Sequence, residues 1–150
     1  LLAFELVTDV LLMAMEKAAA ASCRNVRFCN ANAEAIDRLL PPHCVERLYL
    51  NFSDPWPKRR YEKRRLTAPA FLERYKTVLA PAGTIYFKTD NAGLFAYSRG
   101  SFEACGYALE HVCDDLHASP LAAENIETEY ERNFSAKGFP IHYLEARPRR

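Results

Sequence analysis

Short apolar runs alternate with helix-like segments along the chain. The runs are rich in leucine, β-branched and aromatic side chains and predict buried strands, at residues 1–6, 25–30, 46–50, 83–90, 107–114 and 140–147. The segments between them carry good helix formers with apolar residues three and four positions apart, which predicts helices, at residues 10–21, 33–40, 67–80, 91–105 and 128–138. This alternation predicts an α/β fold with a mainly parallel sheet and helices on both faces. No long linker interrupts it, so we expect a single domain over residues 1–150.

Acidic residues stand where several of the predicted strands end. Glu5 lies at the end of the first strand, Asp54 follows the third, and Asp90 ends the fourth. Ligands bind beyond the carboxyl ends of the strands in open α/β sheets, so these three residues are candidates for a site. Glu5 suits an acid that binds ribose hydroxyls, with a solvated strand end as the alternative. Asp90 shares with Asn91 the ability to cap the next helix.

The most informative stretch is NFSDPWPKRRYEKRRLT, at residues 51–67. Asp54 is followed by Pro55, Trp56 and Pro57, so two fixed φ angles and one large ring restrict the loop. This stiffness favours a ligand-contacting carboxylate over a simple turn aspartate. Six of the eight residues at positions 58–65 are basic and one is acidic, so pairing within the segment cannot neutralise it. We expect this segment to bind phosphates, with an ordinary solvated face as the alternative.

Composition narrows the class of protein. With 150 residues and 49% hydrophobic side chains the chain can bury a core, and its net charge of only +1 makes the basic signal local. The five cysteines include no C-x-x-C pair and the histidines lack metal-ligand spacing, so we expect free, buried thiols and no metal. Four charged residues interrupt the apolar stretch at residues 1–21, which argues against a membrane span and favours a cytoplasmic protein. The chain opens on Leu1 rather than Met, which suggests a missing N-terminus.

Three blocks together closely resemble the bacterial tRNA (guanine-N7)-methyltransferase family. They are the stretch at residues 51–67, FKTDN at residues 87–91 and TEYERNFSAKGFPI at residues 128–141, in the family's order and spacing. The resemblance runs over essentially the whole chain. It implies a Rossmann-like class I methyltransferase fold, S-adenosyl-L-methionine as the cofactor, and tRNA as the partner, methylated at N7 of the variable-loop guanosine. Members of the family occur as monomers and as homodimers.

The resemblance also implies roles for individual residues. Asp54 becomes the catalytic acid, shared with the cofactor site, Glu5 the ribose-binding acid, and Asn32 a neighbour of the cofactor's adenine. The implied substrate contacts are Lys58, Asp90, Thr128, Glu129, Tyr130 and Glu131. The implied RNA-binding segment comprises Arg60, Tyr61, Glu62, Lys63, Arg64 and Arg65. The spacing of Thr128 and Glu131 by itself predicts a helix capping box, and the two roles are compatible.

Two departures from the family pattern qualify this interpretation. Asn32 stands where the family usually has aspartate, so it keeps an acceptor oxygen but not the charge. The family's first strand, glycine-rich cofactor loop and following helix lie ahead of Leu1, so we expect a partial domain whose sheet lacks a middle strand. Two alternatives stay open. SDPW loosely resembles the (N/D)-P-P-(Y/F) motif of amino-group methyltransferases of nucleic acid, and a chain without the glycine-rich loop could be a non-catalytic tRNA-binding fragment.

Overall fold

The strands form two separate sheets in the computed structural model, which describes residues 1–149. The smaller sheet is a parallel pair, β1 (Leu2–Glu5) and β2 (Arg27–Asn30). The larger sheet has the order β3-β4-β6-β5, with β3 (Val45–Asn51), β4 (Leu79–Thr89), β6 (His142–Pro148) and β5 (Tyr107–Cys113). Most predicted strands are therefore confirmed to within a few residues.

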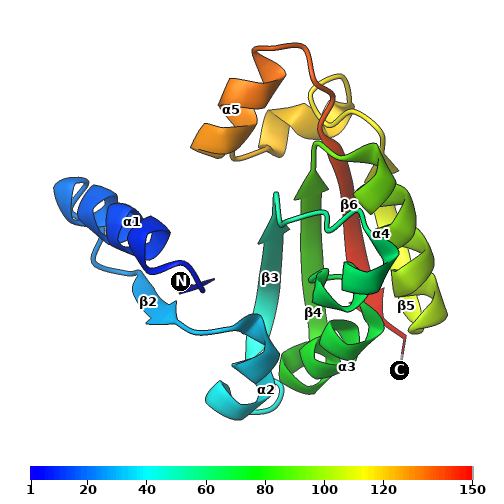
Figure 1. Ribbon diagram of the computed structural model, residues 1–150, viewed down its shortest axis with the longest axis horizontal. Coiled ribbons are helices and arrows are strands. Elements are labelled where there is room, and N and C mark those ends of the chain that lie inside the picture. The colour runs from blue at the N-terminus through cyan, green and yellow to red at the C-terminus, as the bar shows by residue number, and fades with distance from the viewer. Residues whose placement is uncertain (150) are drawn as a thin grey trace.

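Helices connect these strands (Figure 1). The α-helices are α1 (Thr8–Ala20), α2 (Ile36–Leu39), α3 (Pro69–Val78), α4 (Ala92–Ala104) and α5 (Glu129–Ser135). The 3₁₀ turns are η1 (Ala33–Ala35), η2 (Arg59–Arg64) and η3 (Pro120–Glu124). The predicted α/β alternation is confirmed, with α1 beside the smaller sheet and α3 and α4 beside the larger one.

The larger sheet is mixed, and here the expectation of a mainly parallel sheet needs correction. β3 runs parallel to β4, but β6 lies between β4 and β5 and is antiparallel to both. The cause is the path of residues 114–141, which carry η3 and α5. These residues stay at the edge of the sheet where β5 ends, so β6 starts at that edge and runs back antiparallel to β5. Figure 1 shows α5 at this edge, above the ends of β3 and β4.

The core lies between β3, β4 and β6 on one side and α3 and α4 on the other. Phe87 of β4 and Phe102 of α4 are fully buried in it. Tyr107 is buried as well, and its hydroxyl donates a hydrogen bond of 2.7 Å to the carbonyl of Leu72, which gives its polar atom a partner. The core thus fixes β3 and β4, the two strands whose ends carry Asp54 and Asp90.

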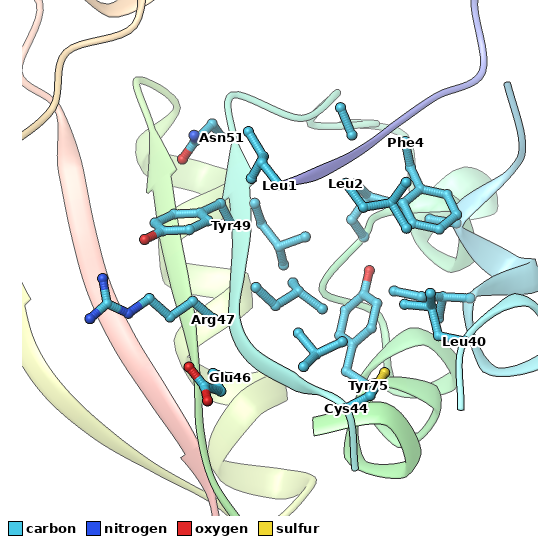
Figure 2. Close-up of a pocket in the computed structure, with 17 residues that line it drawn as sticks. Leu1, Leu2, Phe4, Leu40, Cys44, Glu46, Arg47, Tyr49, Asn51 and Tyr75 are labelled. Atoms are coloured by element: carbon cyan, nitrogen blue, oxygen red, sulfur yellow. The ribbon is translucent and has the colours of Figure 1, made fainter. Parts of the chain in front are cut away.

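A groove of about 700 Å³ separates the two sheets (Figure 2). Leu2 and Phe4 of β1 line one wall, and Leu48 and Leu50 of β3 line the other. Tyr75 of α3 closes part of its floor. Among the described residues, β3 pairs with no strand on its groove side, and neither does β1. The groove lies between two strands that each run parallel to their own neighbour.

Candidate active site

The Asp54 loop leaves β3 through a sharp turn. Phe52 has a positive φ of 53°, and its backbone N–H donates to the carbonyl of Lys88 at 2.9 Å, which ties the loop to β4. Trp56 also has a positive φ, of 42°, an unusual conformation for a bulky residue. Asp54 lies between these two bends and is exposed. The local conformation therefore presents its carboxylate to solvent at the carboxyl end of the sheet.

The basic segment folds as η2 and stacks on its own aromatic rings. The Arg64 guanidinium lies 5.0 Å from the Trp56 ring centroid and 4.9 Å from that of Tyr61, and the two rings meet edge to face at 5.7 Å. The Arg60 guanidinium lies 4.7 Å from the Tyr61 centroid. Five of the basic side chains belong to exposed residues, namely Lys58, Arg59, Arg60, Lys63 and Arg64. Arg65 is half-buried and differs from them in its contacts.

Asp90 is left out of the capping of α4. Asn91 is the N-cap, and its side chain accepts a hydrogen bond from the backbone N–H of Leu94 at 2.8 Å. The half-buried Asp90 instead lies next to Tyr130 of α5. Burial raises the pKa of the Tyr130 hydroxyl, and the charge of Asp90 and a side-chain hydrogen bond to it raise that pKa further. Asp90 thus keeps its carboxylate at the site.

The T-E-Y-E block reaches the same place. The Tyr130 ring packs against Phe52, with 4.8 Å between centroids, and stacks on Phe134 at 4.2 Å. Tyr130 therefore contacts the loop after β3 through Phe52 and the end of β4 through Asp90. The three blocks that carry the family resemblance are brought together at one edge of the larger sheet.

The predicted capping box of α5 is confirmed. The backbone N–H of Glu131 donates to the Thr128 hydroxyl at 3.1 Å, and the backbone N–H of Thr128 donates to the Glu131 carboxylate at 3.4 Å. Glu129, by contrast, is exposed and forms an ion pair with Lys17 of α1. The first and last residues of the block are therefore fixed by the helix cap, whereas Glu129 between them lies at the surface.

Glu131 is the most deeply buried member of the block, and its substrate contact stays a prediction. Its side chain is 0% exposed, and its carboxylate accepts hydrogen bonds from Lys88 at 3.0 Å and from Asn125 at 2.7 Å. The His117 ring lies 2.9 Å away. These partners hold the carboxylate, so Glu131 anchors α5 to β4. The sequence offered no signal for Lys88, Asn125 or His117 in this role, because these residues lie outside the helix of Glu131, at 43, 6 and 14 positions from it.

Glu5 and Asn32 lie at the neighbouring carboxyl ends of β1 and β2. Glu5 Oε1 accepts a hydrogen bond from the backbone N–H of Val7 at 2.8 Å. The Asn32 side-chain oxygen accepts from the backbone N–H of Glu34 at 2.9 Å, so the acceptor expected to face adenine already has one partner, and the amide also carries an N–H₂ group. The pair offers a carboxylate and an amide donor at one strand edge.

The cysteines, possible metal ligands and helix lengths bear on three further expectations. All five cysteines are free, but Cys23 and Cys44 are exposed and the others half-buried, so the expectation of buried thiols is wrong. Within residues 1–149, no group of three or more His, Cys, Asp or Glu side chains is arranged to hold a metal ion. None of the described helices has the length and apolar character needed to cross a membrane.

The comparisons with known proteins now identify the family. The family described as "Putative methyltransferase" matches residues 1–144. The tRNA (guanine-N(7)-)-methyltransferase of Lactiplantibacillus plantarum is 48% identical over 144 residues, which are 96% of this chain and 67% of the relative. The chain belongs to the tRNA (guanine-N7)-methyltransferase family. The enzyme of that name from Bacillus licheniformis is 49% identical over 95% of this chain and 66% of its own length. The chain thus spans about two thirds of the length of these relatives.

The fold agrees with membership in the tRNA (guanine-N7)-methyltransferase family. A solved S-adenosylmethionine-dependent methyltransferase from Aquifex aeolicus superimposes with a TM-score of 0.62, covering 97% of this chain and 66% of that protein. At 14% identity this likeness concerns the fold alone. The Rossmann-like class I fold is confirmed, and S-adenosyl-L-methionine is the cofactor of the family.

The donor set at the ends of β1 and β2 suits that cofactor. A carboxylate such as Glu5 accepts hydrogen bonds from ribose hydroxyls, and only one of its two oxygens is occupied by Val7 among the described residues. The free N–H₂ group of Asn32 can donate to a ring nitrogen of adenine. These two residues would hold the nucleoside end of S-adenosyl-L-methionine, whose sulfonium supplies the methyl group.

Proposed function

We propose that the protein methylates N7 of the variable-loop guanosine of tRNA, acting in the cytoplasm. The observation that carries this proposal is the convergence of the three blocks at the carboxyl ends of β3 and β4. Asp54 and Asp90 follow these two adjacent parallel strands, and Tyr130 lies beside Asp90. Two carboxylates at one strand edge, next to an exposed basic segment, suit a nucleic-acid base that gains positive charge.

The chemistry needs alignment more than proton transfer. Guanine N7 has a lone pair and no proton, so the attack on a methyl group requires no general base. The protein must hold N7 in line with the methyl group and stabilise the charge that develops on the purine. Asp54 does the second task by Coulomb attraction and by accepting hydrogen bonds from the guanine edge, and Asp90 is a further acceptor.

The exposed basic residues would hold the tRNA in register. Lys58 and Arg60 project from the segment that follows Asp54, and phosphate contacts there position a nucleic acid without reading its sequence. Thr128, Glu129 and Tyr130 are the members of the T-E-Y-E block that reach the surface, whereas Glu131 is buried. The guanosine would then lie between the Asp54 loop and the start of α5.

Methyl transfer from labelled S-adenosylmethionine to unmodified tRNA tests the proposal. The tRNA is digested to nucleosides afterwards, and Asp54→Ala is assayed beside wild type, with Glu103→Ala as a control that removes an exposed acid on α4. We expect 7-methylguanosine from wild type and the control, and a rate at least about 100-fold lower for Asp54→Ala with tRNA binding retained.

Each other outcome has a defined meaning. Equal rates for wild type and Asp54→Ala would contradict the role of Asp54. A methylated amino group in the digest would favour an amino-group methyltransferase. Binding of tRNA by wild type without methyl transfer and without binding of S-adenosylmethionine would favour a non-catalytic tRNA-binding protein.

A further inference from the structure

Arg65 is oriented toward the Asp54 loop and away from solvent. Its Nε donates a hydrogen bond of 3.0 Å to the carbonyl of Pro55, and its Nη2 donates one of 3.0 Å to the carbonyl of Trp56. The flat face of the guanidinium lies over the Tyr97 ring, with its central carbon 4.2 Å from the ring centroid. These contacts use the Nε and Nη2 edge of the Arg65 guanidinium, whereas the other basic residues of the segment are exposed.

The two carbonyls belong to the residues directly after Asp54. Pro55 and Pro57 have no backbone N–H, so this part of the loop cannot build a hydrogen-bonded ladder of its own. The positive φ of Trp56 adds a conformation that a non-glycine residue adopts only when its surroundings impose it. The guanidinium of Arg65 restrains this part of the loop from outside, at the two residues that directly follow Asp54.

The Arg65 end of the loop is itself attached to the core. The carbonyl of Arg65 accepts a hydrogen bond of 2.9 Å from the backbone N–H of Ala68. The buried hydroxyl of Thr67 lies 2.7 Å from that of Ser98, and Ser101 donates 2.6 Å to the carbonyl of Thr67. Since Ser98, Ser101 and Tyr97 all lie on α4, a continuous set of contacts runs from this rigid helix through Arg65 to the Asp54 loop.

We propose that Arg65 is a positioning residue for Asp54 and contributes no phosphate contact. This assignment revises the role that the family resemblance implied for Arg65, and its part in catalysis rests on the proposed function. A planar guanidinium is required, because a lysine ammonium keeps the charge but cannot donate two parallel hydrogen bonds to neighbouring carbonyls while stacking on a ring. Arg65→Lys therefore separates positioning from charge.

Trp56 provides a direct readout that does not depend on activity. It is the only tryptophan in the chain, and its own carbonyl is one of the two that Arg65 holds. We expect Arg65→Lys to increase quenching of Trp56 fluorescence by acrylamide, because the loop opens. The matched control is Arg59→Ala, an exposed basic residue of the same segment, which should leave the quenching unchanged.

The tRNA experiments also separate Arg65 from Arg59, because one variant should change methyl transfer and the other tRNA binding. Arg65→Lys should leave the tRNA Kd and its salt dependence within about twofold of wild type, while methyl transfer at saturating tRNA falls about 10- to 100-fold, as displacement of a catalytic group does. Arg59→Ala should weaken tRNA binding and reduce the salt slope by about 1. Circular dichroism and thermal melting are used to check that both variants are folded.

The outcomes distinguish this inference from the proposed function. If Arg65→Lys leaves both the quenching and the methyl-transfer rate at wild-type values, the positioning role is wrong. If Arg65→Ala lowers the salt slope as Arg59→Ala does, Arg65 is a phosphate contact and the inference is overturned. If wild type transfers no methyl group, the proposed function fails, and the quenching and salt-slope measurements still decide whether Arg65 holds the loop.

Discussion

The buried ion pair between Lys88 and Glu131 gives the sharpest prediction about stability. The Glu131 side chain is 0% exposed and that of Lys88 is 9% exposed, with 3.0 Å between Nζ and Oε2. Replacing Lys88 by Met keeps an unbranched side chain that is one atom shorter, but leaves the carboxylate without the lysine cation. Removing one partner of a buried pair costs about 3–5 kcal/mol in free energy of unfolding. That is a large part of the roughly 5–15 kcal/mol typical of a domain.

The assay is urea unfolding of wild type and variants, followed by circular dichroism. Lys17→Met is the matched control, because Lys17 pairs with Glu129, two residues before Glu131, with side chains 59% and 69% exposed. An exposed pair of this kind contributes little to stability, because water screens its charges. A loss of less than about 1 kcal/mol for Lys88→Met, equal to that of the control, would refute the argument that burial makes this pair energetically important.

The same pair predicts how stability depends on pH. Burial by itself raises the pKa of Glu131, but hydrogen bonds from Lys88 and Asn125, the charge of Lys88 and the hydrogen bond to His117 together bring it below its usual 4.5. A carboxyl group with a lowered folded-state pKa binds protons more readily when unfolded. Its contribution to stability is therefore present above pH 4.5 and is lost as the pH falls through the folded-state pKa. Wild type should show this loss and Glu131→Gln should not.

Two further predictions concern the larger sheet. Gly83→Ala should lower the free energy of unfolding by about 1–3 kcal/mol, because an added Cβ would lie 2.7 Å from the Val45 carbonyl oxygen. Gly100→Ala, in the middle of α4 with no atom within 4 Å of the new Cβ, should instead stabilise by about 0.5–1 kcal/mol, and urea unfolding compares the two. The hydrogen bond that the His111 ring donates to Glu145, followed by the charge of Glu145, raises the pKa of His111 above 6.5, so this contribution to stability is lost as the pH rises through the folded-state value. An NMR titration should show the His111 pKa fall in Glu145→Gln, and an unchanged value would contradict the assignment.

Local features of the fold were predictable from the sequence. Strand and helix positions follow from the spacing of apolar residues, and the capping box of α5 follows from Thr128 and Glu131 because its hydrogen bonds join residues three positions apart. The direction of β6 was not predictable, because it depends on where residues 114–141 run in space. Asn91 and Asp90 were equally good caps in the sequence, and the backbone conformation decided for Asn91.

The candidate site could be predicted only in outline. A run of basic residues gives no reason to separate Arg65 from its neighbours, since the difference arises from its approach to the Pro55 and Trp56 carbonyls. The partner of Glu131 was equally hidden, because Lys88 lies 43 residues away and on another element. Both roles depend on long-range contacts that no periodicity or spacing encodes.

Each of the first and last of the three sequence blocks combines residues exposed at the site with residues that hold the site's elements in place. In the first block Asp54 is open to solvent, whereas Arg65 holds the loop that carries it. In the last two blocks Asp90 and Tyr130 meet at the strand edge, whereas the buried Lys88 and Glu131 fasten β4 to α5. A residue in such a block can therefore be essential for methyl transfer without contacting the substrate. Variants of the residues that hold these elements, such as Arg65, should lower the methyl-transfer rate at saturating tRNA. Variants of the exposed cations should instead raise the tRNA Kd. Measuring both quantities for each variant separates the two classes.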